Sequence, residues 1–189
     1  MRKNIGLTLL ELMVGIAVAA VVAALAAPSF DRLIASTRLN AQTTEFLSAL
    51  LYARTEALKR NMNVSVCRTP NPAANPPACG VNNDGGGWAS GWLVFSDGGN
   101  AGVVDGADQV LRVGQPATTM TFALPTSGRY NNWLGFSSTG LPRVAGGGVG
   151  NGTIIICNGS LREAILISNT GRITRTRAAE NAACDAPIP

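Results

Sequence analysis

Three arginines near the C-terminus are the residues whose type and spacing most directly suggest a binding chemistry. Arg172, Arg175 and Arg177 fall within seven residues, 171–177, that contain no acid. The planar guanidinium of arginine donates two parallel hydrogen bonds to a phosphate, so it is suited to anion recognition. In an extended segment Arg175 and Arg177 point to one face and Arg172 to the other. The segment therefore predicts salt-sensitive contacts with nucleic-acid phosphates that do not read the base sequence.

Other polar side chains could extend this basic surface. Thr174 and Thr176 add hydroxyl donors between the arginines, and Arg129, Arg143 and Arg162 are expected in other loops, where they could widen the surface. The competing interpretation is an ordinary solvated edge strand, because charged side chains commonly protect the edges of β-sheets.

The composition argues against catalysis and metal binding. The 189 residues include no histidine, which removes the commonest general base and every zinc site that needs imidazole. Beyond the N-terminal tip only Lys59 and carboxylates remain as bases, so we expect no enzyme, no cofactor and no metal. Calcium is an alternative for the oxygen donors Asp97, Asn100, Asp105 and Asp108. Their spacing is not that of an EF-hand, and such residues are also typical of a solvated loop.

One acid, Glu11, interrupts an apolar stretch that runs from Leu7 to Ala27. As a helix this stretch would be about 32 Å long, which is about the thickness of the hydrocarbon core of a bilayer. Arg2 and Lys3 precede it, which predicts a cytoplasmic N-terminus and export of the rest. A cleaved secretory signal peptide is the alternative. Because an acid inside a membrane is costly and usually functional, Glu11 favours a helix that is retained.

The residues around Glu11 resemble the cleavage and methylation motif of type IV pilins and type II secretion pseudopilins. They read Gly6-Leu7-Thr8-Leu9-Leu10-Glu11-Leu12-Met13. The resemblance implies that prepilin peptidase cuts after Gly6 and that Leu7 becomes the N-methylated first residue. It also implies that Glu11 pairs with the N-terminal amine of a neighbouring subunit during assembly. Leu7 departs from the family, which usually has Phe there. A strong ion pair in surroundings of low dielectric constant agrees with this role of Glu11.

This resemblance predicts three parts of the chain. They are a leader peptide at 1–6, a hydrophobic transmembrane and filament-core helix at 7–28, and a periplasmic globular domain at 29–189. Pro28 predicts a break or kink directly after the apolar stretch. The implied location is a single pass of the inner membrane before assembly and the extracellular pilus afterwards. The implied partners are other major and minor pilins, prepilin peptidase and the inner membrane.

The elements that position these residues follow from hydrophobic periodicity. Between Ser29 and Arg60, apolar residues recur mostly at helical spacing, so this half of a rod about 80 Å long should lie against a sheet. Short apolar or alternating runs predict strands at 64–67, 92–96, 110–113, 119–124, 134–137, 153–157, 164–168 and 172–177. We therefore expect an α+β protein with the type IV pilin fold, in which a long N-terminal helix packs on antiparallel β-sheets.

Four cysteines allow two disulfides in three possible pairings. Cys67 and Cys79 flank a proline-rich loop, which favours a bond between them. The second bond is then Cys157–Cys184, which fixes the C-terminal tail to a strand. Oxidation suits an exported domain. The alternative, a metal site built from the four thiolates, lacks a close Cys-x-x-Cys pair.

Two further segments resemble the GspH/FimT-type minor pilins. Residues Gly91-Trp92-Leu93-Val94-Phe95-Ser96-Asp97 resemble the Gly-Trp-x-x-Phe-x-Asp segment of that family. Gly171 and Arg172 resemble the start of the Gly-Arg-x-Arg motif of FimT-type pilins, which bind DNA during natural transformation. The second arginine of the motif is expected at Thr174, and the charge returns at Arg175 and Arg177.

The sequence therefore predicts a minor type IV pilin that binds double-stranded DNA non-specifically through its C-terminal arginines for DNA uptake. The residues expected to contact DNA are Arg172, Arg175, Arg177, Thr174, Thr176, Arg162 and Arg143. One alternative is a GspH-like minor pseudopilin of a type II secretion system, with a structural role in protein interactions; the arginine-rich tail favours the pilin. Another alternative is a secreted ligand-binding protein with a cleaved signal peptide.

Overall fold

The computed structural model describes residues 8–81, 84, 87–106, 108–117, 119–123, 129–148, 150–178 and 182–186, without the side chains of residues 25–29 and 123. The chain divides into two compact units, Met1–Thr37 and Arg38–Pro189. The expected processing residues, Gly6 and Leu7, lie outside the described residues.

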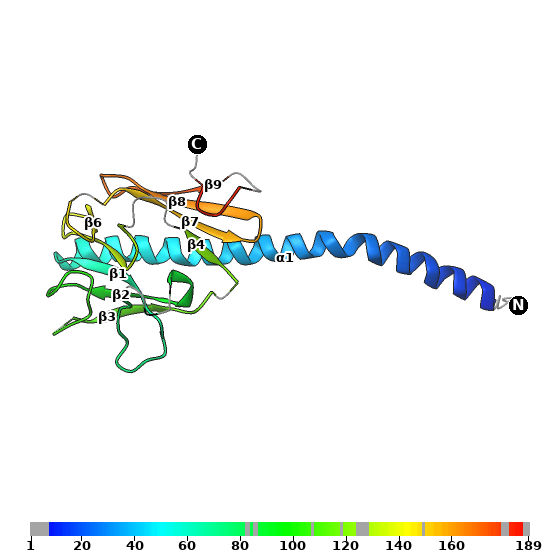
Figure 1. Cartoon of the computed structure of the whole chain (residues 1–189), viewed down its shortest axis with the longest axis horizontal. Helices are drawn as coiled ribbons and strands as arrows, with labels where there is room; N and C mark the ends of the chain where they lie inside the picture. Colours follow the sequence, from blue (N-terminus) through cyan, green and yellow to red (C-terminus); the bar gives the residue numbers. More distant parts are fainter. Residues whose placement is uncertain are drawn as a thin grey trace, which may run out of the picture. The chain divides into compact units, whose positions relative to one another are not determined.

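Helix α1 extends from Leu9 to Arg60 (Figure 1). The break predicted at Pro28 does not occur, because the alanines that precede it favour the helix and proline removes only one of its hydrogen bonds. The large apolar side chains between Leu9 and Val22 are all more than half exposed. No helix in the described part of the chain is both long and apolar enough to cross a membrane. The transmembrane helix expected at 7–28 therefore stays a prediction.

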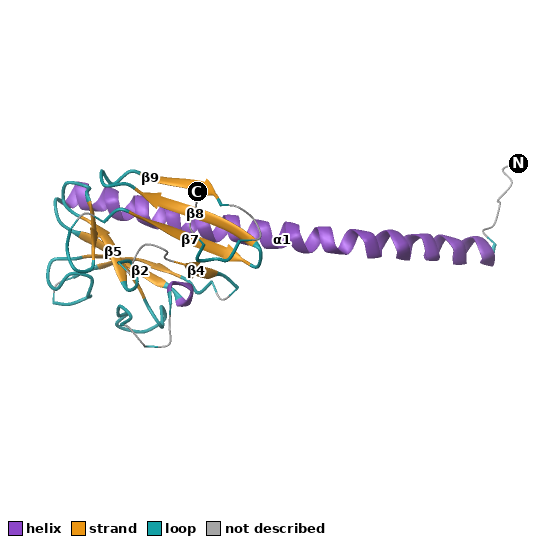
Figure 2. Ribbon diagram, turned by 45° about the horizontal axis from the view of Figure 1, so that its top comes forward, coloured by secondary structure: helices purple, strands orange, loops and turns teal. Residues whose placement is uncertain are grey.

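The second unit contains two antiparallel sheets, whose strands are orange in Figure 2. The first sheet has the order β3-β2-β1-β5-β6 and contains β1 (Val64–Arg68), β2 (Trp92–Ser96), β3 (Val110–Gly114), β5 (Trp133–Phe136) and β6 (Pro142–Val144). The second has the order β4-β7-β8-β9 and contains β4 (Thr121–Ala123), β7 (Gly152–Asn158), β8 (Leu161–Ile167) and β9 (Ile173–Arg177). A short 3-10 helix, η1 (Trp88–Ser90), precedes β2. Every predicted strand overlaps an observed one, and β6 was missed.

The core lies where the C-terminal part of α1 meets both sheets. Phe46 of α1 is fully buried. Its ring makes edge-to-face contacts with Trp88 and Trp92, on the side of the first sheet, at centroid distances of 5.4 and 6.0 Å. It contacts Phe122 of β4, in the second sheet, at 5.4 Å. Phe46 therefore joins the helix to both sheets.

Both expected disulfides are present. Cys67–Cys79 ties the proline-rich loop to β1. Cys157–Cys184 ties the C-terminal tail to β7, where the two cysteines pack with Ile155 and Ala164. The tail is thus fixed on the face of the second sheet that points away from α1.

Candidate nucleic-acid interface

Strand β9 carries Arg175 and Arg177, begins directly after Arg172, and lies at one end of the second sheet, paired with β8. Arg175 is opposite Ile165 in the register, and Ile165 belongs to the core cluster that contains α1 residues. Because side chains alternate along a strand, Arg175 and Arg177 lie on the α1 face, whereas Thr174 and Thr176 lie on the outer face. The predicted division of the arginines between two faces is the one the structure has.

The turn before β9 requires glycine at position 171. Gly171 has a φ of +76°, and a β-carbon there would come 2.2 Å from the carbonyl oxygen of Gly140. The backbone N–H of the next residue, Arg172, donates to Ser168 Oγ at 3.0 Å. A side chain at position 171 would therefore displace the turn that carries Arg172.

Arg54 of α1 holds this turn from the other side. Its Nε donates to the carbonyl oxygen of Gly140 at 3.2 Å, and its Nη2 donates to that of Thr170 at 3.3 Å. Gly140 lies in the turn between β5 and β6, and Thr170 in the turn between β8 and β9. One helix side chain thus fixes a turn from each sheet.

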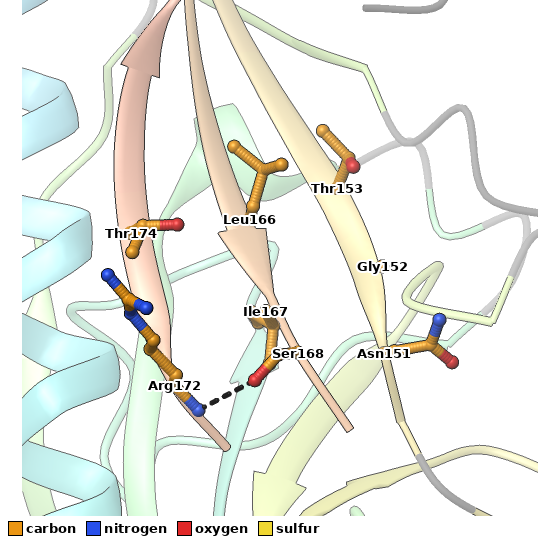
Figure 3. Close-up of a pocket in the computed structure, with 8 residues that line it drawn as sticks. All are labelled: Asn151, Gly152, Thr153, Leu166, Ile167, Ser168, Arg172 and Thr174. Atoms are coloured by element: carbon orange, nitrogen blue, oxygen red, sulfur yellow. Dashed lines mark hydrogen bonds between the residues drawn. The ribbon is translucent and has the colours of Figure 1, made fainter. Parts of the chain in front are cut away.

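A shallow hollow of about 570 Å³ lies on the outer face of the second sheet beside Arg172 (Figure 3). It is lined by Asn151, Gly152, Thr153, Leu166, Ile167, Ser168, Arg172 and Thr174. The side chain of Arg172 extends along β9 towards Thr174. Arg172 is exposed, and its guanidinium makes no ion pair within the described part of the chain. An anion at this face would meet a positive charge and hydroxyl groups.

Arg175, in contrast, is held by neighbours that the sequence analysis missed. Its Nη2 donates to Glu163 Oε1 at 2.5 Å and to Asn40 Oδ1 at 2.8 Å. Its Nη1 donates to Thr44 Oγ1 at 2.9 Å. The Arg175 side chain is 28% exposed and that of Glu163 is 11% exposed. No local signal predicts this arrangement, because Asn40 and Thr44 are 135 and 131 residues away in sequence.

The other predicted arginines differ in placement. Arg177 is exposed on the same face as Arg175. Arg162 is buried, and its Nη2 donates to the carbonyl oxygen of Ala186 in the C-terminal tail. Arg143 lies in the first sheet, with its Nη1 3.6 Å from Asp97 Oδ2. The structure therefore brings Arg172, Arg175 and Arg177 together along β9 and the residue directly before it. These three residues and the two threonines between them form a basic surface that we call the β9 surface. Arg162 and Arg143 lie outside it.

The carboxylates of the candidate calcium loop, residues 97–108, accept hydrogen bonds from groups of the same chain. Asp97 Oδ2 accepts hydrogen bonds from Ser65 Oγ and from a loop N–H. Asp105 Oδ2 accepts one from Asn100 Nδ2 at 2.7 Å, and Asp108 accepts two from loop N–H groups. Among the described residues no group of three or more His, Cys, Asp or Glu could hold a metal ion. These contacts give the loop a structural role.

Comparison with known families identifies the chain. The profile of the family described as Type II transport protein GspH matches residues 42–171. The chain belongs to the GspH family. The profile of the prokaryotic N-terminal methylation motif matches residues 1–27. This GspH-family protein is therefore a minor pilin or pseudopilin, a class whose members interact with other pilins and are processed by prepilin peptidase.

Solved structures show the same fold. A crystal structure of the type IV minor pilin FimU of Pseudomonas aeruginosa (strain PAO1) in space group P21 has a TM-score of 0.54 and 19% identity. The match covers 82% of this chain and 94% of that chain. A second crystal form, in space group P65, has a TM-score of 0.52 and 18% identity over 79% and 96% of the two chains. No curated protein sequence shows a significant match. These likenesses confirm the expected α+β type IV pilin fold.

Proposed function

We propose that this GspH-family protein is a membrane-anchored minor type IV pilin that binds double-stranded DNA for uptake in natural transformation. The observation that carries the proposal is the pair of exposed arginines at the two ends of an edge strand, Arg172 directly before β9 and Arg177 as its last residue. Arginine is a strong phosphate ligand, and a basic strand edge can contact a duplex without reading its bases.

The N-terminal part of α1 supports the assembly role. Glu11 is exposed among apolar side chains that are also exposed. Such a surface is stable when a membrane or neighbouring helices cover it, and the carboxylate then needs a cation. The N-methylated amine of Leu7 in a neighbouring subunit would supply that cation after cleavage at Gly6. Before assembly the subunit would be located in the inner membrane with its globular domain in the periplasm. On assembly it would become part of the extracellular pilus.

N-terminal mass spectrometry of the protein purified from its cells tests this part of the proposal. An N-methylated Leu7 is the expected first residue. A mature protein that begins near Ala27 would show that the apolar stretch is a removed signal peptide and would refute anchoring.

The geometry of β9 limits how DNA can be bound. Arg172 and Arg177 are five residues apart, which is about 17 Å along an extended strand. They point to opposite faces, so both can reach a duplex that lies along the edge of β9 away from β8. Thr174 and Thr176 add hydroxyl groups on the outer face. Two phosphate contacts predict that log K falls by about 1.8 for each tenfold rise in salt.

The test is fluorescence anisotropy of two unrelated labelled DNA duplexes with the full chain in non-ionic detergent, over a series of NaCl concentrations. We expect affinities on the order of micromolar that are equal for the two sequences. Arg172→Gln and Arg177→Gln should each reduce the salt slope by about 0.9. The control is Lys59→Gln, whose side chain is 73% exposed at the C-terminal end of α1. A double arginine variant that binds as the unmodified chain does would refute the site.

The second candidate function is that of a minor pseudopilin in a type II secretion system. The name of the matching family, Type II transport protein GspH, favours it. In that role the chain would contact other pseudopilins and have no need for phosphate binding. An unmodified chain that shows no affinity for either duplex at low salt would support this function over DNA capture.

A further inference from the structure

We propose that Glu163 competes with DNA phosphate for Arg175 and thereby sets the affinity of the β9 surface. This inference rests on the proposed DNA-binding function and adds its regulation. Arg172 and Arg177 are the first ligands for phosphate, because Arg175 is bound to Glu163 in the absence of DNA.

The hydrogen bonds of Arg175 already occupy the N–H groups on both edges of its guanidinium that a phosphate would bind. Each edge of a guanidinium that offers two parallel N–H groups includes Nη2. Both hydrogens of Nη2 are already engaged, one with Glu163 Oε1 and one with Asn40 Oδ1. Phosphate can therefore bind Arg175 at two points only after it displaces one of these acceptors.

The register of the strands explains why Glu163 can do this. Glu163 of β8 lies directly opposite Arg177 of β9, and Arg175 is two residues along β9 on the same face. The Oε2 atom of Glu163 is also 2.5 Å from Arg175 Nη2. Because Glu163 is buried, its charge depends on this ion pair for compensation. Glu163 thus cancels one of the three positive charges of residues 172–177.

The competition is between two anions for one guanidinium. The Glu163 carboxylate belongs to the neighbouring strand, so it binds Arg175 without the loss of translational and rotational freedom that DNA incurs. It therefore occupies Arg175 when DNA is dilute or salt is high. Removal of the negative charge leaves Arg175 with the neutral acceptors of Asn40 and Thr44. A phosphate is a stronger acceptor than either of these, since charge-assisted hydrogen bonds are about twice as strong as neutral ones.

The experiment compares Glu163→Gln with a matched control in the anisotropy assay with the full chain. Glu163→Gln should make the salt slope steeper by about 0.9, as expected for a third phosphate contact, and bind roughly tenfold more tightly at 50 mM salt. The control, Glu56→Gln, also removes a buried glutamate that is 2.5 Å from an arginine, Arg60, but this pair lies at the C-terminal end of α1, away from Asn40 and Thr44. It should leave the slope unchanged. The double variant Glu163→Gln/Arg175→Gln should lose the gain.

Asn40→Ala provides a second test of the competition for Arg175 if Glu163→Gln fails to fold. Asn40 is exposed, so its truncation leaves the core intact while it frees one hydrogen of Arg175 Nη2. A smaller gain in affinity is expected. If neither folded variant gains affinity while Arg172→Gln still weakens binding, the competition is refuted and the proposed function stands. If the unmodified chain and both variants fail to bind DNA at low salt, the proposed function is refuted and the competition with it.

Discussion

Truncation of Phe46 to alanine should remove a large part of the stability of the globular unit. The ring is fully buried and makes three edge-to-face contacts, with Trp88, Trp92 and Phe122. Large-to-small changes of this kind cost about 3–5 kcal/mol, because transfer free energy is lost and a cavity remains. Since net stabilities of domains are about 5–15 kcal/mol, the variant should be close to unfolding under mild conditions.

The assay is urea unfolding of the oxidised full chain, followed by tryptophan fluorescence and by far-ultraviolet circular dichroism. The matched control is Leu51→Ala, which truncates a residue of the same helix that is 44% exposed. We expect the control to lose less than about 1 kcal/mol. A loss below about 1 kcal/mol for Phe46→Ala would refute the view that this ring joins α1 to both sheets.

Three further predictions concern stability. The hydrogen bond from Arg60 lowers the pKa of Glu56, so the folded chain binds this proton less tightly than the unfolded chain does. The resulting stabilisation is present above the ordinary value of 4.5 and is lost as pH falls below it, so Glu56→Gln should flatten the acid side of a plot of melting temperature against pH. Cys157→Ser opens a disulfide whose cysteines are 27 residues apart and should cost about 3.5 kcal/mol in urea unfolding, whereas a loss near zero would contradict the chain-entropy argument. Gly114→Ala would place a β-carbon 1.9 Å from the Trp92 ring, so calorimetry should show a lower melting temperature, and an unchanged one would contradict the packing.

Local patterns predicted the elements well. Alternation and turn residues predicted β2 with its observed ends at Trp92 and Ser96, and periodicity predicted the helix that ends at Arg60. Strand β6 was missed because it is three residues long and begins with Pro142, and proline within a run argues against a strand.

The candidate site was predicted in part. The run of arginines and its division between two faces followed from spacing alone. The sequence could not show that Arg175 is bound by Glu163 and Asn40, because these contacts depend on how β8, β9 and α1 come together. Arg162 was expected in a loop that widens the basic surface, but it lies in β8, where the tail supplies a carbonyl group that lets its guanidinium remain buried.

The hydrogen bonds of Arg54 have a consequence for the order of folding. Their acceptors lie 86 and 116 residues further along the chain, so α1 is synthesised long before either acceptor exists. Contacts of such long range form late and slow folding. A chain that stops before residue 170 keeps α1, the whole first sheet and strands β4, β7 and β8 of the second, but Arg54 then has only one of its two carbonyl acceptors. Arg54 can therefore join the turns of both sheets only after the chain has been synthesised as far as Thr170.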